Sequence, residues 1–438
     1  MTGTGIKRRT FAKLAGAAGF GAATLGGVRA ATASTTSDET AAEIAAAVAA
    51  AQGWKVTGTT VSALASFDST MKTFMQARNI PAGQLAVTYQ GRLVLARGYS
   101  WSSDSTLSVQ PTSLFRVASL TKSFTAAALV KLVQDGKVTL GTKVASILDL
   151  IPPAGQTVDS RLSTVSLWHL LQHTGGWDRT VSGDPQSNDR AIARALGIPL
   201  ELHPTDTIKY MAGQPLDFDP GTKVAYSNFG YNLAGRVIEK VSGLPYATYV
   251  QQNLLTPLGI TRMAQGYSIA KHTGEMPYVS QYTGTTVLDD SGATVPAPYG
   301  SFSMRVHDAN GGWISSAVDL VRWASLFDKA GSVLNSTSLG RVFAVPSIGV
   351  NSDGWYYGLG WQVRPVTGGT GRNTWHTGSL PGTHALMVRT YNGMSWAALF
   401  NQRDDASKLS YGDLDAMLWT AAGKVTSWPT NNLYPNYF

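Results

Sequence analysis

Segments that look like β-strands lie near both ends of this chain, and a long, loop-rich middle separates them. GQLAVTYQGRLVLARGYSW alternates around its central Gln-Gly pair, which predicts a two-stranded hairpin over 83–101. TWHTG, HALMVRTY and SWAALF follow one another between residues 374 and 400 and are also strand-like. Strands at both ends around an irregular middle predict one α/β body, built from both chain ends, into which a mostly helical domain is inserted.

The boundaries of these two parts follow from changes of pattern along the chain. We expect residues 34–140 and 310–438 to form the α/β catalytic domain, and residues 141–309 to form the inserted, mostly helical domain. Apolar residues recur at helical spacing in several segments. The predicted helices are 67–77, 122–134, 166–173, 231–241, 317–327 and 415–423.

The composition is that of a globular protein, because 43% of the 438 residues are hydrophobic and only 14% are charged. The formal net charge is +8, but no block of Lys and Arg follows the first thirteen residues, so we expect no nucleic-acid partner. Cysteine is absent, which excludes disulfides, a thiol nucleophile and cysteine metal ligands. The seven histidines show no ligand spacing, so we predict no metal ion and no cofactor. The oligomeric state stays open.

The N-terminus resembles an export signal. KRRTFAK precedes a Gly- and Ala-rich, mildly apolar stretch at 14–28, and small residues follow at Ala31 and Ala33. This pattern is typical of a twin-arginine signal, so we expect residues 1–33 to be removed and the mature protein to be periplasmic or extracellular. The alternative is a basic helix of the mature protein, but each of the five glycines in the stretch would weaken a helix by up to about 1 kcal/mol. No later stretch approaches the roughly 18 apolar residues of a membrane span.

Ser119 and Lys122 stand three residues apart where a helical pattern begins, in LFRVASLTKSFTAAALVKLVQDG. The start of a helix collects free N–H groups and the positive end of the dipole, and a residue three places on lies on the same face. Apolar neighbours would desolvate Lys122 and favour its neutral form, which could take the serine proton. The pair is therefore a candidate nucleophile and base.

Two other serine–lysine pairs have the same spacing, Ser69/Lys72 and Ser268/Lys271. Nothing around the first resembles a completed site, and the second lies in the polar loop YSIAKHTGE. We interpret both as exposed residues without a catalytic role. The choice of Ser119 therefore depends on its companions elsewhere in the chain.

The first companion is Tyr226-Ser227-Asn228, which follows a Pro-Gly turn and stands at the mouth of a predicted helix. A tyrosine there can pass a proton to a leaving group, and an asparagine can hold both a substrate amide and the lysine. Tyr434-x-Asn436 repeats the spacing in the C-terminal tail, where we expect no such role.

The second companion is a His-Thr-Gly tripeptide. It occurs at 173–175, 272–274 and 376–378. Only the last copy lies in a strand context, TWHTGSLPGTHALMV, where the backbone N–H of Ser379 and that of Ser119 could form an oxyanion hole. His173 follows the helical LWHLLQ, which favours a capping or core role, and the middle copy lies in a loop.

Together these motifs resemble those of a known superfamily. SLTK, YSN and HTG, in this order, are similar to the motifs of serine β-lactamases and penicillin-binding proteins. LWHLLQHTGG, FDPGTKVAYSNFGYNLAGRVIEKVSG, LLTPLGITRM and NGGWISSAVDL narrow the likeness to the branch of class C β-lactamases, D-alanyl-D-alanine carboxypeptidases and esterases. The likeness runs from about Phe67 to Phe400. It implies an α/β fold of the β-lactamase/transpeptidase-like type, with an antiparallel sheet flanked by helices.

The resemblance also assigns roles to residues. It implies that Ser119 is the acylated nucleophile, Lys122 its base and Tyr226 the general acid/base. The residues that it implies for substrate binding are Asn228, His376, Thr377, Gly378 and Ser379. Class C β-lactamases usually have a lysine where this chain has His376, and a neutral imidazole holds a substrate carboxylate less firmly than an ammonium does.

We therefore predict an exported serine hydrolase that cleaves carboxylic esters or amides through an acyl-enzyme on Ser119, with carboxylesterase favoured. The alternatives are a D-alanyl-D-alanine carboxypeptidase or D-amino-acid amidase, then a class C-like β-lactamase. A non-catalytic binding protein on the same fold would be expected to lack part of the motif set, which here is complete. Five aromatic residues are candidates for either the rim of the site or the core: Trp177, Trp313, Tyr356, Tyr357 and Trp375.

Overall fold

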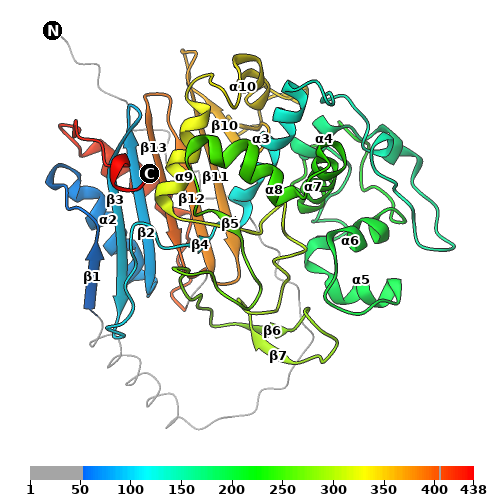
Figure 1. Cartoon of the computed structure of the whole chain (residues 1–438), viewed down its shortest axis with the longest axis horizontal. Helices are drawn as coiled ribbons and strands as arrows, with labels where there is room; N and C mark the ends of the chain where they lie inside the picture. Colours follow the sequence, from blue (N-terminus) through cyan, green and yellow to red (C-terminus); the bar gives the residue numbers. More distant parts are fainter. Residues whose placement is uncertain (1–52, 404–405) are drawn as a thin grey trace.

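The computed structural model describes residues 53–403 and 406–438, so the predicted export signal lies outside the described residues. The largest element is an eight-stranded antiparallel sheet with the order β1-β3-β2-β13-β12-β11-β10-β9 (Figure 1). The strands are β1 (Gly53–Thr57), β2 (Ala82–Tyr89), β3 (Arg92–Ser102), β9 (Tyr356–Tyr357), β10 (Gln362–Pro365), β11 (Arg372–Leu380), β12 (Thr383–Arg389) and β13 (Met394–Phe400). Because β2 pairs with β13, the sheet joins the two ends of the chain, as the sequence predicts.

The hairpin of β2 and β3 turns at Gln90 and Gly91, whose φ angles are 48° and 77°. Two consecutive left-handed residues make the tight turn that matches the twist of antiparallel strands, and glycine adopts this conformation without a Cβ penalty. The predicted hairpin is confirmed, with Ala86 opposite Ala96.

The two faces of the sheet belong to two apolar cores. In β2, Leu85 and Val87 contribute to one core and Ala86 to the other, as the period of two along a strand requires. The flanking helices are α2 (Ala65–Ala77) and α11 (Asp413–Gly423) in the first core, and α3 (Thr121–Gln134) and α9 (Ala317–Ala324) in the second. Figure 1 shows α2 and α9 on opposite sides of the sheet.

The middle of the chain is mostly helical and contains short strands. Its helices are α4 (Leu167–Leu171), α5 (Asp189–Leu196), α6 (Pro204–Met211), α7 (Asn228–Ser242) and α8 (Tyr246–Val250). Its short strands are β5 (Ala264–Gln265), β6 (Thr283–Thr285) and β7 (Thr294–Pro296). Strand β5 forms a small sheet with β4 (Phe115–Arg116) and β8 (Trp313–Ser315), which lie just outside this region, and β6 pairs with β7. The exact domain boundaries stay a prediction. Across the part of the chain that the structure describes, no helix is both long and apolar enough to cross a membrane.

Helix boundaries differ from the predicted ones where capping decides them. Helix α7 begins at Asn228 rather than at 231, because Ser227 caps it and its Oγ accepts the N–H of Gly230 at 3.2 Å. Helix α9 ends at Ala324, and the predicted remainder, 325–327, forms a 3₁₀ turn. A further helix, α10 (Ser336–Val342), follows a loop and packs against α3.

The N-terminus of α3 lies where the sheet meets the helical region. The 3₁₀ turn η2 (Ala118–Leu120) leads into α3 and contacts β11 and β12. Helix α3 itself packs against α7. Residues at the start of α3 can therefore contact both the β11 edge and the start of α7.

Phe74 is the residue whose truncation tests the first core. Its ring is fully buried and lies 5.1 Å from the ring of Phe400 and 5.7 Å from that of Tyr411. We expect Phe74→Ala to lower the free energy of unfolding by about 3–5 kcal/mol, because it leaves a cavity among these rings. Denaturant unfolding followed by circular dichroism measures this. Ile151→Ala, at a side chain that is 67% exposed, should change it by less than about 0.5 kcal/mol.

Candidate active site

Ser119 lies in the turn that immediately precedes α3. Ala118, the residue before it, has a φ of 48°, in the left-handed region that costs a non-glycine residue conformational energy. Such strain is maintained only where the surrounding structure fixes the backbone, and it is frequent beside catalytic groups. The turn thus holds the Ser119 side chain in one defined place at the positive end of the helix dipole.

Gly378 explains how β11 comes close to this turn. A Cβ atom at this position would lie 2.2 Å from the carbonyl oxygen of Val117, so only glycine allows the two backbones to approach. The neighbouring Thr377 and Ser379 are half-buried on the same strand. The structure therefore brings the predicted strand motif beside Ser119.

Lys122 is completely buried and has three polar partners. Its Nζ lies 3.1 Å from Ser119 Oγ, 2.7 Å from Asn228 Oδ1 and 2.7 Å from the carbonyl oxygen of Asn310. Burial lowers the pKa of Lys122 well below its usual value, while the Asp184 carboxylate acts in the opposite direction and raises it. Lys122 is therefore suited to be a neutral amine beside the serine.

Asn228 links the lysine to a carboxylate. Its Oδ1 accepts from Lys122, and its Nδ2 donates to Asp184 Oδ2 at 2.5 Å. Asp184 also caps the next short turn, because its Oδ1 accepts the N–H of Gln186 at 3.1 Å. Sequence reasoning did not identify Asp184, which lies in a loop without a motif, and it assigned no role to Asn310, the first residue of NGGWISSAVDL.

Tyr226 is half-buried and lies against the same lysine. Lys122 Nζ lies 4.8 Å from the centre of the tyrosine ring, and the Arg179 guanidinium lies 4.9 Å from it. Burial raises the pKa of Tyr226 above its usual value, although a hydrogen bond with Ser119 lowers it in part. The phenol is therefore protonated at neutral pH and can donate its proton close to Ser119.

His376 is buried and neutral in this structure. Its Nε2 lies 2.8 Å from Tyr357 Oη and its Nδ1 lies 2.6 Å from the carbonyl oxygen of Thr377. Burial is the largest cause of the fall in the pKa of His376 to about 3. Both ring nitrogens already have protein partners, so the role of His376 in binding substrate stays a prediction. Arg403, which follows β13, approaches this strand with its Nη1 3.4 Å from Ser379 Oγ, and sequence reasoning missed it.

The other serine–lysine pairs lie in different surroundings. The exposed Ser69 Oγ donates to the carbonyl oxygen of Ala65 within α2, at 3.0 Å. Ser268 Oγ accepts the N–H of Met304 at 3.0 Å. The interpretation of both as residues without a catalytic role stays a prediction, since neither contact is catalytic or excludes catalysis.

The aromatic candidates for the rim are mainly core residues. Trp177, Trp313, Tyr356 and Tyr357 are at most 5% exposed, and only Trp375 is partly exposed. The Trp313 ring packs 5.8 Å from the ring of Phe124 in the second core. Most of these side chains therefore belong to the core.

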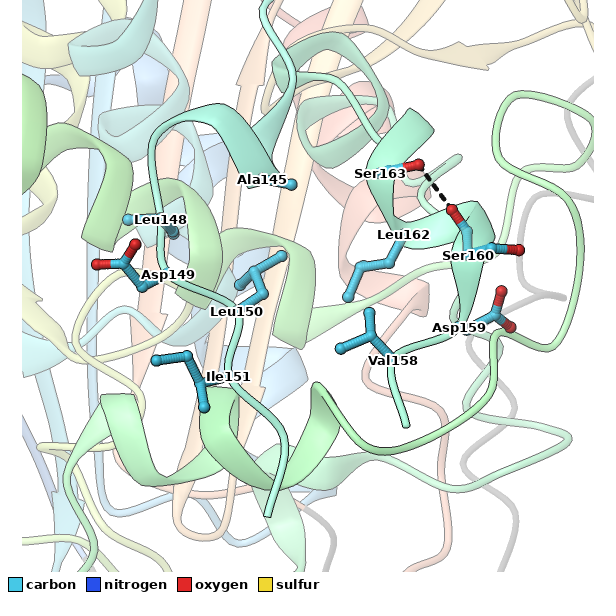
Figure 2. Close-up of a pocket in the computed structure, with 10 residues that line it drawn as sticks. All are labelled: Ala145, Leu148, Asp149, Leu150, Ile151, Val158, Asp159, Ser160, Leu162 and Ser163. Atoms are coloured by element: carbon cyan, nitrogen blue, oxygen red, sulfur yellow. Dashed lines mark hydrogen bonds between the residues drawn. The ribbon is translucent and has the colours of Figure 1, made fainter. Parts of the chain in front are cut away.

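An apolar hollow lies outside this cluster. Figure 2 shows it between residues 145–151 and 158–163, where Leu150, Val158 and Leu162 line it. These segments hold none of the predicted site residues. In residues 53–403 and 406–438, no group of three His, Asp or Glu side chains is placed to hold a metal ion.

Comparison with curated proteins gives partial matches. Protein flp from Staphylococcus aureus (strain COL) is 27% identical over 195 residues, which cover 44% of this chain and 36% of that protein. Protein flp from strain N315 is 26% identical over 235 residues, which cover 51% of this chain and 45% of that protein. The chain thus spans less than half the length of these relatives.

Solved structures match over most of the chain. The D-amino acid amidase from Ochrobactrum anthropi SV3, complexed with L-phenylalanine amide, is 21% identical with a TM-score of 0.63, and the match covers 83% of this chain and 99% of that one. The D-stereospecific amidohydrolase from Streptomyces sp. is 23% identical with a TM-score of 0.60, covering 77% and 94%. These likenesses confirm the predicted fold class.

The family model described as Beta-lactamase matches residues 67–416. This span includes SLTK, YSN and the strand copy of HTG, the motifs from which the resemblance was inferred. The match covers most of the chain and agrees with the fold and with the order of the motifs. The chain therefore belongs to the beta-lactamase family.

Proposed function

We propose that the chain is a serine hydrolase that forms an acyl-enzyme on Ser119. The observation that carries this proposal is the contact of 3.1 Å between Ser119 Oγ and the buried Nζ of Lys122. A neutral amine has two N–H donors and one lone pair. The donors match the acceptors Asn228 Oδ1 and the carbonyl oxygen of Asn310, so the lone pair is left for the serine hydroxyl.

The remaining groups suit the steps of acyl transfer. Lys122 takes the proton as Ser119 Oγ attacks the substrate carbonyl, and the backbone N–H groups of Ser119 and Ser379 stabilise the oxyanion. Tyr226 donates its proton to the leaving group. Asn228 keeps one N–H of its amide for the substrate, since the other is bound by Asp184. Water then releases the acyl group, with the proton transfers reversed.

The preferred substrates are esters and amides that carry no carboxylate beside the scissile bond. Class C-like β-lactamases usually have a lysine at the position of His376, whereas this imidazole is buried and neutral and offers no fixed cation there. Carboxylic esters and D-amino-acid amides fit this requirement. An amidase activity is also supported by the names of two solved structures with the same fold, the D-amino acid amidase and the D-stereospecific amidohydrolase.

A second candidate is a carboxypeptidase that acts on D-alanyl-D-alanine peptides. It is favoured by Arg403, because a guanidinium 3.4 Å from Ser379 Oγ could bind the terminal carboxylate of such a peptide at the end of β11.

Secretion through a twin-arginine signal is a separate proposal and rests on residues 1–33.

Replacement of the nucleophile tests the main proposal. We expect Ser119→Ala to lower kcat for p-nitrophenyl butyrate by at least about 10³-fold, because no other group can form the acyl-enzyme. Ser268→Ala is the matched control and should retain full activity. Release of p-nitrophenolate from both variants and the wild type measures this. Full activity of Ser119→Ala would contradict the assignment of the site, and an inert wild type would contradict the esterase activity.

The pH profile tests Lys122 as the base. The pKa of His376 is about 3, and burial lowers the pKa of Lys122 well below its usual value, so Lys122 is the buried group beside Ser119 that can set the acid limb of kcat/KM. Asp184→Asn keeps the acceptor for Asn228 but removes the charge that raises the lysine pKa. We therefore expect the acid limb to move to lower pH. Asp149→Asn, at an exposed carboxylate of the apolar hollow, should leave it in place. A limb that stays or moves to higher pH in Asp184→Asn would refute this role.

Arg403 separates the two candidate functions. We expect Arg403→Gln to lower kcat/KM for a peptide ending in D-alanyl-D-alanine by about 10- to 100-fold, since a hydrogen bond to a charged group contributes about 1.5–3 kcal/mol. Hydrolysis of p-nitrophenyl butyrate serves as the internal control and should not change. An equal loss on both substrates, or no cleavage of the peptide by the wild type, would speak against the carboxypeptidase.

A further inference from the structure

His173 belongs to the first His-Thr-Gly copy, yet it lies beside Tyr226 rather than in a remote part of the core. It follows α4 and has a φ of 58°, in the left-handed region. Its carbonyl oxygen accepts the N–H of Ala225 at 2.8 Å, and its Nδ1 accepts the N–H of Ser227 at 3.1 Å. The two hydrogen bonds therefore hold the backbone on both sides of Tyr226.

The imidazole of His173 also contacts the side chain of Tyr226. The two ring centres are 4.4 Å apart, and the imidazole also contacts the Tyr357 ring, at 4.3 Å. Because Nδ1 accepts a hydrogen bond, the ring proton of the neutral imidazole is on Nε2. This nitrogen is buried and has no hydrogen-bond partner among the described residues. An unpaired buried N–H is costly, which indicates that the position of this ring has another use.

We propose that His173 is a positioning residue that fixes the Tyr226 phenol for proton transfer to the leaving group. This inference rests on the proposed acyl-enzyme mechanism. His173 does not touch the reacting atoms, since it acts on the backbone and on the ring face of Tyr226. Replacement of His173 should therefore lower kcat/KM in the same way as removal of the Tyr226 hydroxyl. The loss should be larger for a leaving group that must be protonated as the bond breaks.

Two esters with the same acyl group provide the test. p-Nitrophenolate leaves as a stable anion, whereas the alkoxide of ethyl butyrate must be protonated as the bond breaks. We expect His173→Asn to lower kcat/KM for ethyl butyrate by about 10²-fold, as displacement of a catalytic group by about 1 Å does. For p-nitrophenyl butyrate the loss should stay within about tenfold. Asparagine is the suitable replacement because it tolerates a positive φ and offers a carbonyl acceptor.

A double-mutant cycle distinguishes positioning from a general loss of structure. Tyr226→Phe should show the same dependence on the leaving group, and His173→Asn should cause little further loss in its presence. His272→Asn is the matched control, because His272 lies in a loop against the carbonyl oxygen of Gln265 and should leave both activities unchanged. The thermal unfolding midpoint shows whether each variant is folded.

A crystal structure of His173→Asn gives a readout that does not depend on activity. We expect the Tyr226 hydroxyl to move away from Ser119 by about 1 Å. An unmoved hydroxyl, equal losses on both esters, or an additive loss in the double variant would overturn the inference. If the wild type cleaves neither ester, the proposed function fails, while the position of the hydroxyl still decides whether His173 holds Tyr226.

Discussion

The site depends on one buried amine. Burying a charged lysine costs several kcal/mol, so Lys122 can be accommodated only if its environment either pairs the charge or favours the neutral form. Here the amine joins its own helix to the start of α7 through Asn228 and to a loop through the carbonyl oxygen of Asn310. Two acceptors and one hydroxyl around a neutral amine leave a single arrangement for its hydrogens. The same contacts that hold the helical region against α3 therefore also aim a lone pair at Ser119.

Charged groups of both signs act on this amine and shift its pKa in opposite directions. Burial and Arg179 lower the pKa of Lys122, whereas Asp184 raises it through a carboxylate that reaches the lysine by way of the Asn228 amide. Burial likewise favours the neutral form of His376, whose pKa falls to about 3. A site of this kind contains few groups that can change charge near neutral pH. The pKa of Lys122, and with it the reactivity of Ser119, is then set mainly by two opposing effects: burial lowers this pKa and the Asp184 carboxylate raises it.

The sequence allowed prediction of those features that have a local physical cause. The β2–β3 hairpin follows from alternation around a Gln-Gly turn, and the contact of Ser119 with Lys122 follows from the helical turn in which η2 leads into α3. Asp184 has no such signal. As the N-cap of a short turn after a glycine it resembles many surface aspartates, and only the folding of its loop onto Asn228 gives it a function. Contacts between loops distant in sequence leave no periodic pattern to detect.

The three His-Thr-Gly copies show the limit of a short motif. Their glycines serve different physical needs. Gly378 permits the close approach of β11 to the carbonyl of Val117, Gly175 leaves room for the Trp177 ring, which a Cβ would meet at 2.5 Å, and Gly274 supplies a turn with a φ of 82°. The tripeptide is the same, but the requirement that selects glycine is set by what lies next to it in space. Strand context identified the copy beside Ser119 because a strand edge is where backbones approach each other. It could not identify His173, whose use depends on the backbone of Tyr226 more than fifty residues away.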